Sequence, residues 1–251
     1  MYFTFDVEMK KILLILPILF TFQFAQAQKF DGLRLSGIVA LSFPTEPFSQ
    51  NDHPLNDTRG YALPGLYAGV SGEIFLSKHW SFGMRGGYSI YEFNESEYQK
   101  ELEKGISEDH SINVSATPYQ TLNLLGQIEF SQFLFKDKLD INPYLGIGLG
   151  ILRTSERSYT LTDTMDVVVE NYNRRSEVQS GFQMIPGLAF NYAILSFLEL
   201  RVFGEYMMSD HRLTETSTLK TPATETTVIR SENVDYNLRA FNVGGGLSLR
   251  F

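Results

Sequence analysis

The sequence contains no cysteine, which excludes disulfide bonds, thiol catalysis and zinc sites built on cysteine. Basic residues are also scarce. The chain has 21 Lys and Arg against 29 Asp and Glu, giving a net charge of -8 and a pI near 5.1, whereas a nucleic-acid surface needs a basic stripe. After Gln28 there is no apolar run long enough for a membrane-spanning helix. In place of these features the chain has 20 Phe, 13 Tyr and 20 Gly, a mixture that favours strands.

The amino-terminal segment has the order of a cleavable signal peptide. In "MKKILLILPILFTFQFAQAQ" the pair Lys10 and Lys11 precedes an apolar run from Ile12 to Phe24 and then "AQA" before Gln28. A charged, an apolar and a small-residue region in this order predict export, with Met9 as the start, residues 1–27 as the signal peptide and cleavage after Ala27. A membrane anchor is the alternative, but the apolar stretch is short and ends in a cleavage pattern. The mature domain is then 28–251.

Beyond Gln28 apolar residues recur with a period of two, which is typical of strands with two different faces. In "PYLGIGLGIL" the residues Leu145, Ile147, Leu149 and Ile151 share one face and glycines occupy the other. The same alternation marks seven more segments, namely "LRLSGIVALSF", "GLYAGVSGEIFL", "WSFGMRGGYSI", "TLNLLGQIEF", "FQMIPGLAFNY", "FLELRVFGEY" and the last strand, which ends in "GGGLSLRF". The sequence therefore predicts eight strands.

Short and long connections alternate between these strands. Three links are tight turns, whereas four are long and polar, at about residues 44–64, 93–117, 153–181 and 210–237. An antiparallel up-and-down sheet with turns at one end and loops at the other produces this alternation, and closing the sheet into a barrel removes its edges. The predicted fold is thus an all-β, eight-stranded antiparallel barrel with four long surface loops and three short turns.

Two barrel types fit this alternation. A soluble lipocalin-like barrel points its apolar face at a ligand, whereas an outer-membrane barrel points it at lipid. A solvated outer face should carry lysines, yet the nine lysines lie in the signal peptide, turns, loops or strand edges. Aromatic residues also gather near the strand ends, as in the interfacial girdles of membrane barrels. The candidate girdle comprises Phe43, Trp80, Phe82, Tyr88, Phe130, Phe182, Tyr192 and Tyr206. We therefore expect the membrane barrel.

The mature chain resembles the small eight-stranded outer-membrane β-barrel domain family of Gram-negative bacteria. The stretches "PYLGIGLGIL", "GLYAGVSGEIFLSKHWSF" and "NVGGGLSLRF" are similar to Bacteroidetes members of the PorT-like, opacity-protein-like or OmpA-like kind, and "AQAQ" is typical of that phylum. The resemblance implies an outer-membrane location with lipid and lipopolysaccharide as surroundings. It also implies that an aromatic carboxyl terminus is read by the barrel-assembly machinery, here through Phe241, Val243, Leu247, Leu249 and Phe251.

Strand parity places a mixed set of charged side chains in the predicted lumen. They are Arg34, Glu73, Arg85, Glu129, Glu199, Arg201 and Glu205. Charges buried in a narrow space are costly unless they are paired, so we expect an ionic plug. An eight-stranded lumen is filled by side chains, which predicts a barrel without an open channel. A proton or ion path through these charges is the alternative.

The sequence predicts no catalytic residue, no metal site and no cofactor. Of the four histidines, His53 and His110 fall in loops and His79 in a turn. His211 follows Ser209 and Asp210 at the top of a strand, but neighbouring strand residues point to opposite faces, so Asp210 cannot orient His211. The acidic stretch "NESEYQKELEKGISEDH" lacks the ligand spacing of a calcium loop, and we expect a short solvated helix there.

Two classes of function remain open from the sequence. The first is a non-enzymatic surface scaffold or envelope protein whose four loops contact partners outside the cell. The second is an accessory barrel subunit of a secretion, gliding or uptake complex. A lipid A-modifying enzyme is kept in reserve, with Ser209 and His211 as the residues to test.

Overall fold

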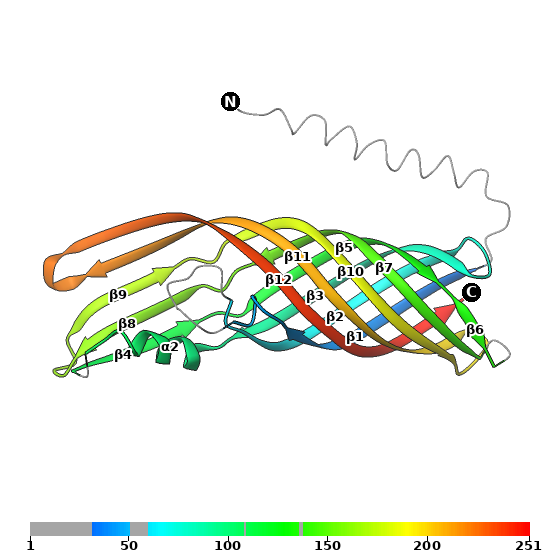
Figure 1. The fold of residues 1–251 in the computed structure, drawn as a ribbon, viewed down its shortest axis with the longest axis horizontal. Coiled ribbons are helices and arrows are strands. Elements are labelled where there is room, and N and C mark those ends of the chain that lie inside the picture. Colours follow the sequence, from blue (N-terminus) through cyan, green and yellow to red (C-terminus); the bar gives the residue numbers. More distant parts are fainter. Residues whose placement is uncertain (1–31, 51–59, 108, 136–137) are drawn as a thin grey trace, which may run out of the picture.

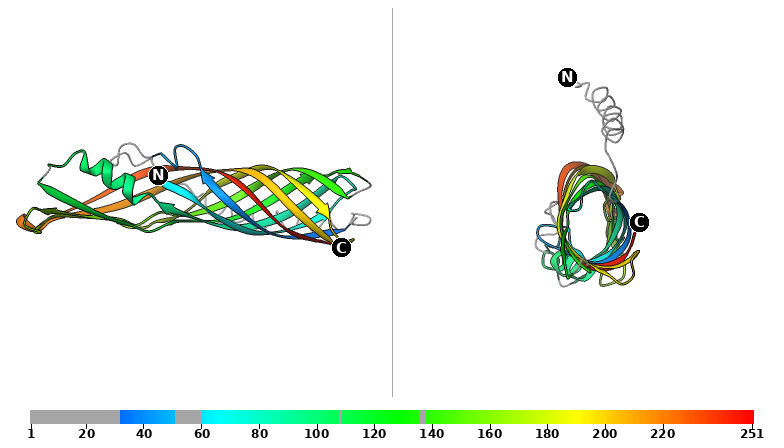
Figure 2. Two further views of the ribbon diagram at one scale, coloured as in Figure 1. Left: turned by 90° about the horizontal axis from the view of Figure 1, so that it is seen from below. Right: turned by 90° about the vertical axis from the view of Figure 1, so that its right-hand side faces the viewer.

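The computed structural model describes residues 32–50, 60–107, 109–135 and 138–251. The predicted signal peptide and cleavage site lie outside these residues. Eight long strands pair in antiparallel fashion with their neighbours, and β12 returns to β1, so the sheet closes on itself in the order β1-β2-β3-β5-β7-β10-β11-β12. Viewed along its axis the sheet forms a ring (Figure 2). The predicted eight-stranded up-and-down barrel is confirmed.

The ring strands are β1 (Leu33–Pro44), β2 (Ala62–Phe75), β3 (Trp80–Phe93), β5 (Tyr119–Phe130), β7 (Leu139–Arg153), β10 (Val178–Ala193), β11 (Leu198–Thr221) and β12 (Thr226–Arg250). Three short turns connect β2 to β3, β5 to β7 and β10 to β11 at one end of the barrel, called here the turn end. The three-residue strand β6 (Gln132–Leu134) pairs with β7 in the second of these turns. The carboxyl terminus lies at the turn end (Figure 1), and β1 begins beside it, because Leu33 bonds to Phe251 through the backbone.

The two faces of the wall differ as the alternation predicts. Along β1 every second residue from Arg34 to Ser42 is buried, while Leu35, Val39, Leu41 and Phe43 are exposed. The same holds around the ring, so the barrel carries an outward apolar belt, formed by residues that include Leu66, Val70, Met84, Leu122, Leu124, Ile128, Ile147, Leu149, Leu188, Phe190, Leu200, Val202, Phe241, Val243, Leu247 and Leu249. The apolar face therefore points away from the lumen, and the lipocalin-like alternative is wrong.

At the opposite end, called the loop end, the wall continues far beyond the belt. The strand β11 has 24 residues, about twice the 9–11 residues that cross a bilayer. Three further strands extend the wall: β4 (His110–Ala116) beyond β5, β8 (Arg157–Asp163) beyond β7 and β9 (Val168–Arg174) beyond β10. They pair in the order β11-β9-β8-β4. With the upper half of β12 they form a five-stranded sheet that stands above the belt (Figure 1).

This sheet corrects the loop boundaries expected from the sequence. The predicted loops 153–181 and 210–237 consist largely of paired strands. In the second of them, the 3-10 helix η1 (Pro222–Thr224) connects β11 to β12. The predicted loop 93–117 contains the expected helix, α2 (Glu95–Glu103), and β4. The helix is not fully solvated, because Tyr98 is buried in the core. Cross-strand pairing above the belt satisfies backbone groups that a polar loop would leave to water.

Among the described residues, no helix combines the length and the hydropathy needed to cross a membrane.

Candidate functional site

The lumen near the turn end contains a cluster of charged side chains centred on Arg34. Its fully buried guanidinium contacts carboxylate oxygens of four residues, at 2.7 Å for Glu129, 2.8 Å for Asp140, 3.1 Å for Glu199 and 3.5 Å for Glu73. Register explains one of these contacts directly, because Arg34 and Glu73 are opposite each other on β1 and β2. One guanidinium thus bridges carboxylates from β2, β5, β7 and β11.

Arg201 on β11 completes this cluster. Its guanidinium lies 2.9 Å from Glu129 and 3.8 Å from Glu73. The side-chain amide of Gln127 donates to Glu129 at 3.2 Å and to Glu73 at 3.4 Å. The cluster therefore cross-links most of the ring through charge-assisted contacts, which are stronger than neutral hydrogen bonds.

A second cluster lies farther along the lumen toward the loop end. Arg85 donates through both terminal nitrogens to Glu205, at 2.6 and 2.8 Å. Glu205 also accepts from the hydroxyl of Tyr144 at 2.5 Å and from the amide of Asn242 at 2.8 Å. The Nε of Arg85 donates to the Tyr67 hydroxyl at 2.9 Å. The carboxylate and the guanidinium are thus both supplied with partners, as a buried pair requires.

Glycines make room for the two tyrosines of this cluster. A Cβ added at Gly87 would collide with the Tyr67 ring, and one added at Gly187 would collide with the Tyr144 ring. The rings can therefore lie across the neighbouring strands because these positions have no side chain.

All seven charged residues that parity assigned to the lumen are buried inside the barrel. Sequence reasoning missed Asp140, because β7 begins at Leu139 but the predicted strand began at Pro143. It also missed Tyr67, Tyr144 and Asn242 as partners, although each has inward parity. A polar residue at an inward position opposite a charged one is the signal that could have found them.

Above the charged clusters the lumen changes to an aromatic core, called here the neck. It contains Phe48, Tyr61, Tyr91, Phe93, Tyr98, Tyr119 and Tyr236. Edge-to-face contacts join the rings, for example Phe48 with Tyr119 at 5.1 Å and Tyr61 with Tyr98 at 5.3 Å between centroids. Such contacts add to the burial energy of each ring. The neck joins α2 and the residues after β1 to the barrel wall.

Arg157 lies in the middle of the neck. One of its nitrogens donates to the hydroxyls of Tyr119 at 2.6 Å and Tyr236 at 3.0 Å, and its guanidinium lies over the Phe93 ring at 4.9 Å. Tyr236 in turn donates to Glu215 at 2.9 Å, and Glu215 forms an ion pair with Arg174. These contacts connect a buried cation to a carboxylate through a phenol. Sequence analysis assigned Arg157 and Arg174 to a loop.

The described residues contain no group of three or more His, Asp or Glu that could hold a metal ion. His79 lies in a turn, where its Nδ1 is 2.8 Å from the Ser131 carbonyl oxygen and its ring stacks on Phe130. His110 is the first residue of β4. His53 lies outside the described residues.

Ser209 and His211 form the one serine–histidine pair seen in the described part of the chain. The Oγ of Ser209 and the Nε2 of His211 are 2.7 Å apart, and both side chains are buried on the inner face. Asp210 points outward and pairs with Arg239 at 2.6 Å, so it does not orient His211, as parity predicted. The pair faces the packed lumen rather than lipid or solvent.

His211 supports a prediction about pH. It lies beyond Met208, the last outward apolar residue of β11, so it is outside the belt. Burial lowers its pKa from 6.5 to about 4. Below about pH 6.5 the His211 side chain is protonated in the unfolded chain, whereas in the folded chain it stays neutral down to about pH 4. The free energy of unfolding therefore decreases as the pH falls through this range. We expect the loss of unfolding free energy between pH 7 and pH 4.5 to be about 2 kcal/mol smaller in His211→Asn. Urea titrations of both chains at the two pH values measure this, and identical losses would contradict it.

On the outer surface the candidate girdle residues are placed at the two margins of the belt. Trp80 and Tyr192 are exposed near the turn end, and Tyr88 and Phe182 are exposed near the loop end. The five candidate assembly residues on and after β12 all point outward. Phe251 exchanges backbone hydrogen bonds with Leu33 at 2.9 and 3.1 Å. The carboxyl terminus therefore takes part in closing the ring.

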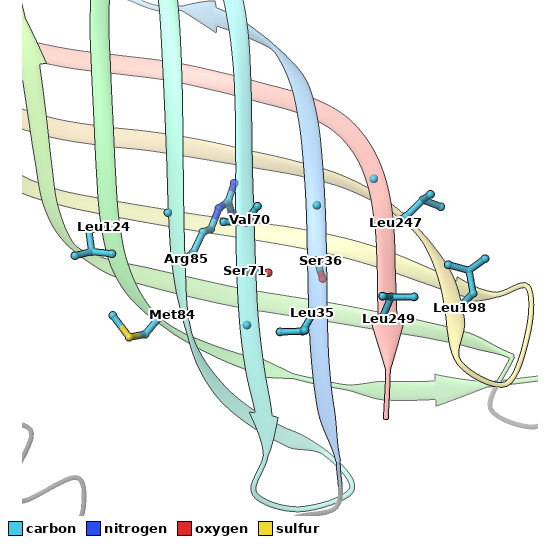
Figure 3. Close-up of a pocket in the computed structure, with 14 residues that line it drawn as sticks. Leu35, Ser36, Val70, Ser71, Met84, Arg85, Leu124, Leu198, Leu247 and Leu249 are labelled. Carbon is cyan, nitrogen blue, oxygen red and sulfur yellow. The ribbon is translucent and has the colours of Figure 1, made fainter.

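A shallow depression of about 1010 Å³ crosses the belt over β12, β1, β2 and β3. Leucine and methionine side chains, among them Leu35, Met84 and Leu249, surround it (Figure 3), and its floor includes Gly37, Gly72 and Gly86. Met84 and Arg85 are neighbours on β3 but point to opposite sides of the wall (Figure 3). The depression thus belongs mainly to the apolar outer surface.

No protein-family model matches the chain, and no curated protein matches it significantly. Solved structures that resemble it include Neisserial surface protein A (NspA), at 11% identity and a TM-score of 0.43, covering 89% of this chain and 100% of that one. A major outer membrane protein from Thermus thermophilus has 14% identity and a TM-score of 0.46, covering 87% and 99%. OprG from Pseudomonas aeruginosa has 13% identity and a TM-score of 0.42, covering 90% and 98%. At these values the likenesses carry no argument about function.

The chain's own geometry is decisive for its location. A closed antiparallel barrel, an apolar outer belt with aromatic margins and a polar, charged interior are the features of barrels that cross outer membranes. An apolar surface of this extent would not be left in contact with water. The protein is therefore a small β-barrel of the bacterial outer membrane.

Proposed function

We propose that the protein is a non-enzymatic, non-conducting outer-membrane barrel that acts as a surface scaffold or envelope protein. The observation that carries this proposal is the filled lumen. Charged clusters around Arg34 and Arg85 occupy the part of the lumen near the turn end, and the neck occupies the part near the loop end. The rigid barrel then serves to hold the five-stranded sheet and α2 above the membrane.

The proposal includes the biogenesis predicted from the sequence. Residues 1–27 direct export, and the outward residues Phe241, Val243, Leu247, Leu249 and Phe251 are the signal for the barrel-assembly machinery. The carboxyl-terminal strand β12 pairs with β1, and this pairing supports a role for β12 in the last step of barrel closure. Kinship with the Bacteroidetes PorT-like group is part of the same proposal.

Catalysis on membrane lipid is not favoured by the position of Ser209 and His211. An enzyme acting on lipid A needs its nucleophile and base at the membrane-facing surface, in reach of the substrate. Both side chains instead point into the packed interior. The accessory-subunit alternative is tested by purification from native membranes, where a stoichiometric larger partner would favour it over an independent scaffold.

The expected result in planar bilayers follows from the filled lumen. Insertion of the folded protein should add no stepwise ion current to that of the bare bilayer, because side chains fill the lumen of an eight-stranded barrel. An open porin prepared in the same detergent is the positive control. Discrete, reproducible conductance steps from the protein would contradict the proposal and favour the ion-path alternative.

A further inference from the structure

The outward face of the sheet above the belt has an unusual composition. Buried residues such as Val114, Arg157, Arg174 and Val234 fix the inner face, and their strand neighbours therefore point outward. Over five strands the outward residues are mostly hydroxyl or amide side chains, and Ile229, opposite Thr218, is an apolar exception. This hydroxyl–amide face comprises Ser111, Asn113, Ser115, Ser158, Thr160, Thr162, Asn171, Asn173, Thr214, Thr216, Thr218, Thr227, Ser231 and Asn233.

Cross-strand hydrogen bonds hold these side chains in fixed positions. The hydroxyls of Ser111 and Thr162 are 2.6 Å apart, Thr160 donates to Asn171 at 3.0 Å, and Thr214 donates to Asn233 at 2.8 Å. A hydroxyl or amide in such a pair retains unused donor or acceptor capacity. The face therefore presents an ordered array of hydrogen-bonding groups to its surroundings.

The array is also hollowed at one place. A depression of about 300 Å³ lies between β8, β9 and β11, and its outward lining consists of Ser158, Thr160, Asn171, Asn173, Thr218 and Lys220. Lys220 is at the distal margin, and the exposed pair of Arg212 and Asp235 marks the margin next to the membrane. Between these margins charged side chains are few, the exposed Arg175 beside Thr216 being one of them.

This chemistry selects among classes of occupant. A nucleic acid needs a basic surface, and a protein interface is usually anchored by aromatic residues or arginine. A bilayer interior needs an apolar surface, which ends at the belt. An uncharged ligand that is rich in hydroxyl groups matches the face, because sugar hydroxyls both donate and accept hydrogen bonds.

The orientation of the face indicates where that ligand comes from. The face is the outer side of the barrel wall, and the wall runs along the barrel axis (Figure 1). In a barrel that spans the membrane, the face therefore points sideways along the membrane surface. The lipid-contacting belt lies directly below it on β11 and β12. On the outer-membrane location given above, we propose that the hydroxyl–amide face binds the uncharged sugar chain of neighbouring lipopolysaccharide molecules.

Isosteric substitution tests this inference. Thr160→Val, Thr216→Val and Thr218→Val together remove three outward hydroxyls while keeping β-branched side chains that suit a strand. Binding of fluorescently labelled lipopolysaccharide to the folded protein in detergent is measured by anisotropy, with one preparation carrying its complete uncharged sugar chain and the other truncated before it. The original chain should bind the complete form about tenfold more tightly, which a few net hydrogen bonds can supply. The triple variant should bind both forms equally.

Three threonines away from the face provide a matched control. Thr164→Val, Thr224→Val and Thr226→Val remove the same number of hydroxyls at the distal tips and should keep the tenfold preference. Equal binding of both lipopolysaccharides by the original chain, or an undiminished preference in the triple variant on the face, would overturn the inference. Heat-modifiable electrophoretic mobility of the same samples reports the barrel separately, so the inference can fail while the proposed function stands.

Discussion

Replacing Arg34 by methionine should lower the free energy of unfolding in detergent by at least about 3–5 kcal/mol. Methionine approximates the volume of the arginine stem but removes the guanidinium that contacts Glu73, Glu129, Asp140 and Glu199. Glu73 and Glu129 would then share the guanidinium of Arg201, and Glu199 would keep Arg250 at 3.5 Å. Four buried carboxylates would have lost their common cation, which is costly. Urea titration of the folded barrel measures the loss, and the only tryptophan, Trp80 in the belt, serves as the fluorescent probe.

The same substitution at Arg212 is the control for this prediction. Arg212 pairs with Asp235 at 2.7 Å, a distance like that between Arg34 and Glu129, but both side chains are exposed. An exposed ion pair contributes about 0–1 kcal/mol. If Arg34→Met were no more destabilising than Arg212→Met, the lumen cluster would not be a stabilising element of the barrel.

Replacing Val70 by arginine should make folding into a bilayer less favourable by about 2–4 kcal/mol. Val70 is 66% exposed in the middle of β2, where it pairs with Gly37 and Gly86 at the centre of the belt. Its side chain has ample room, so the cost comes from placing a charge in hydrocarbon rather than from a steric clash. Folding equilibria in lipid vesicles measure the effect.

Ile229 supplies a closely matched control. It is also a β-branched residue on a strand and is 67% exposed, but it lies on β12 far above the belt. Ile229→Arg should change the folding free energy by no more than about 0.5 kcal/mol, as is usual for substitutions at a solvated surface. Equal effects at the two positions would mean that the belt does not face lipid.

Strand parity made most of the lumen predictable from the sequence. Shifting a strand by one residue would exchange its two faces. Once the apolar face of a run such as Leu33 to Phe43 is assigned to the outside, the remaining residues must therefore point into the lumen. That rule placed Arg34, Arg85 and Glu205 in the interior. It could not identify which side chains meet there, because the partners come from strands far apart in sequence.

The region above the belt was harder to predict for a physical reason. Outside lipid, both faces of a strand can be polar, and the alternation that marks a strand then disappears. The stretch from Thr214 to Lys220 has threonines on its outward face and Glu215, Ser217 and Leu219 on its inward face, and it was read as a loop. Its threonine content favours strands, and Leu213 opposite Val234 marks an inward position. Arg157 was missed because a single arginine between polar residues gives no sign of burial.

The closed barrel with its apolar face outward is tested most directly by electrophoresis. The mobility of boiled and unboiled samples of the mature chain, 28–251, refolded in detergent is compared, with circular dichroism on the same samples. We expect a band that shifts on boiling and a β spectrum before boiling. A chain that is soluble without detergent and shows no shift would mean that the apolar face points inward and that no membrane barrel forms.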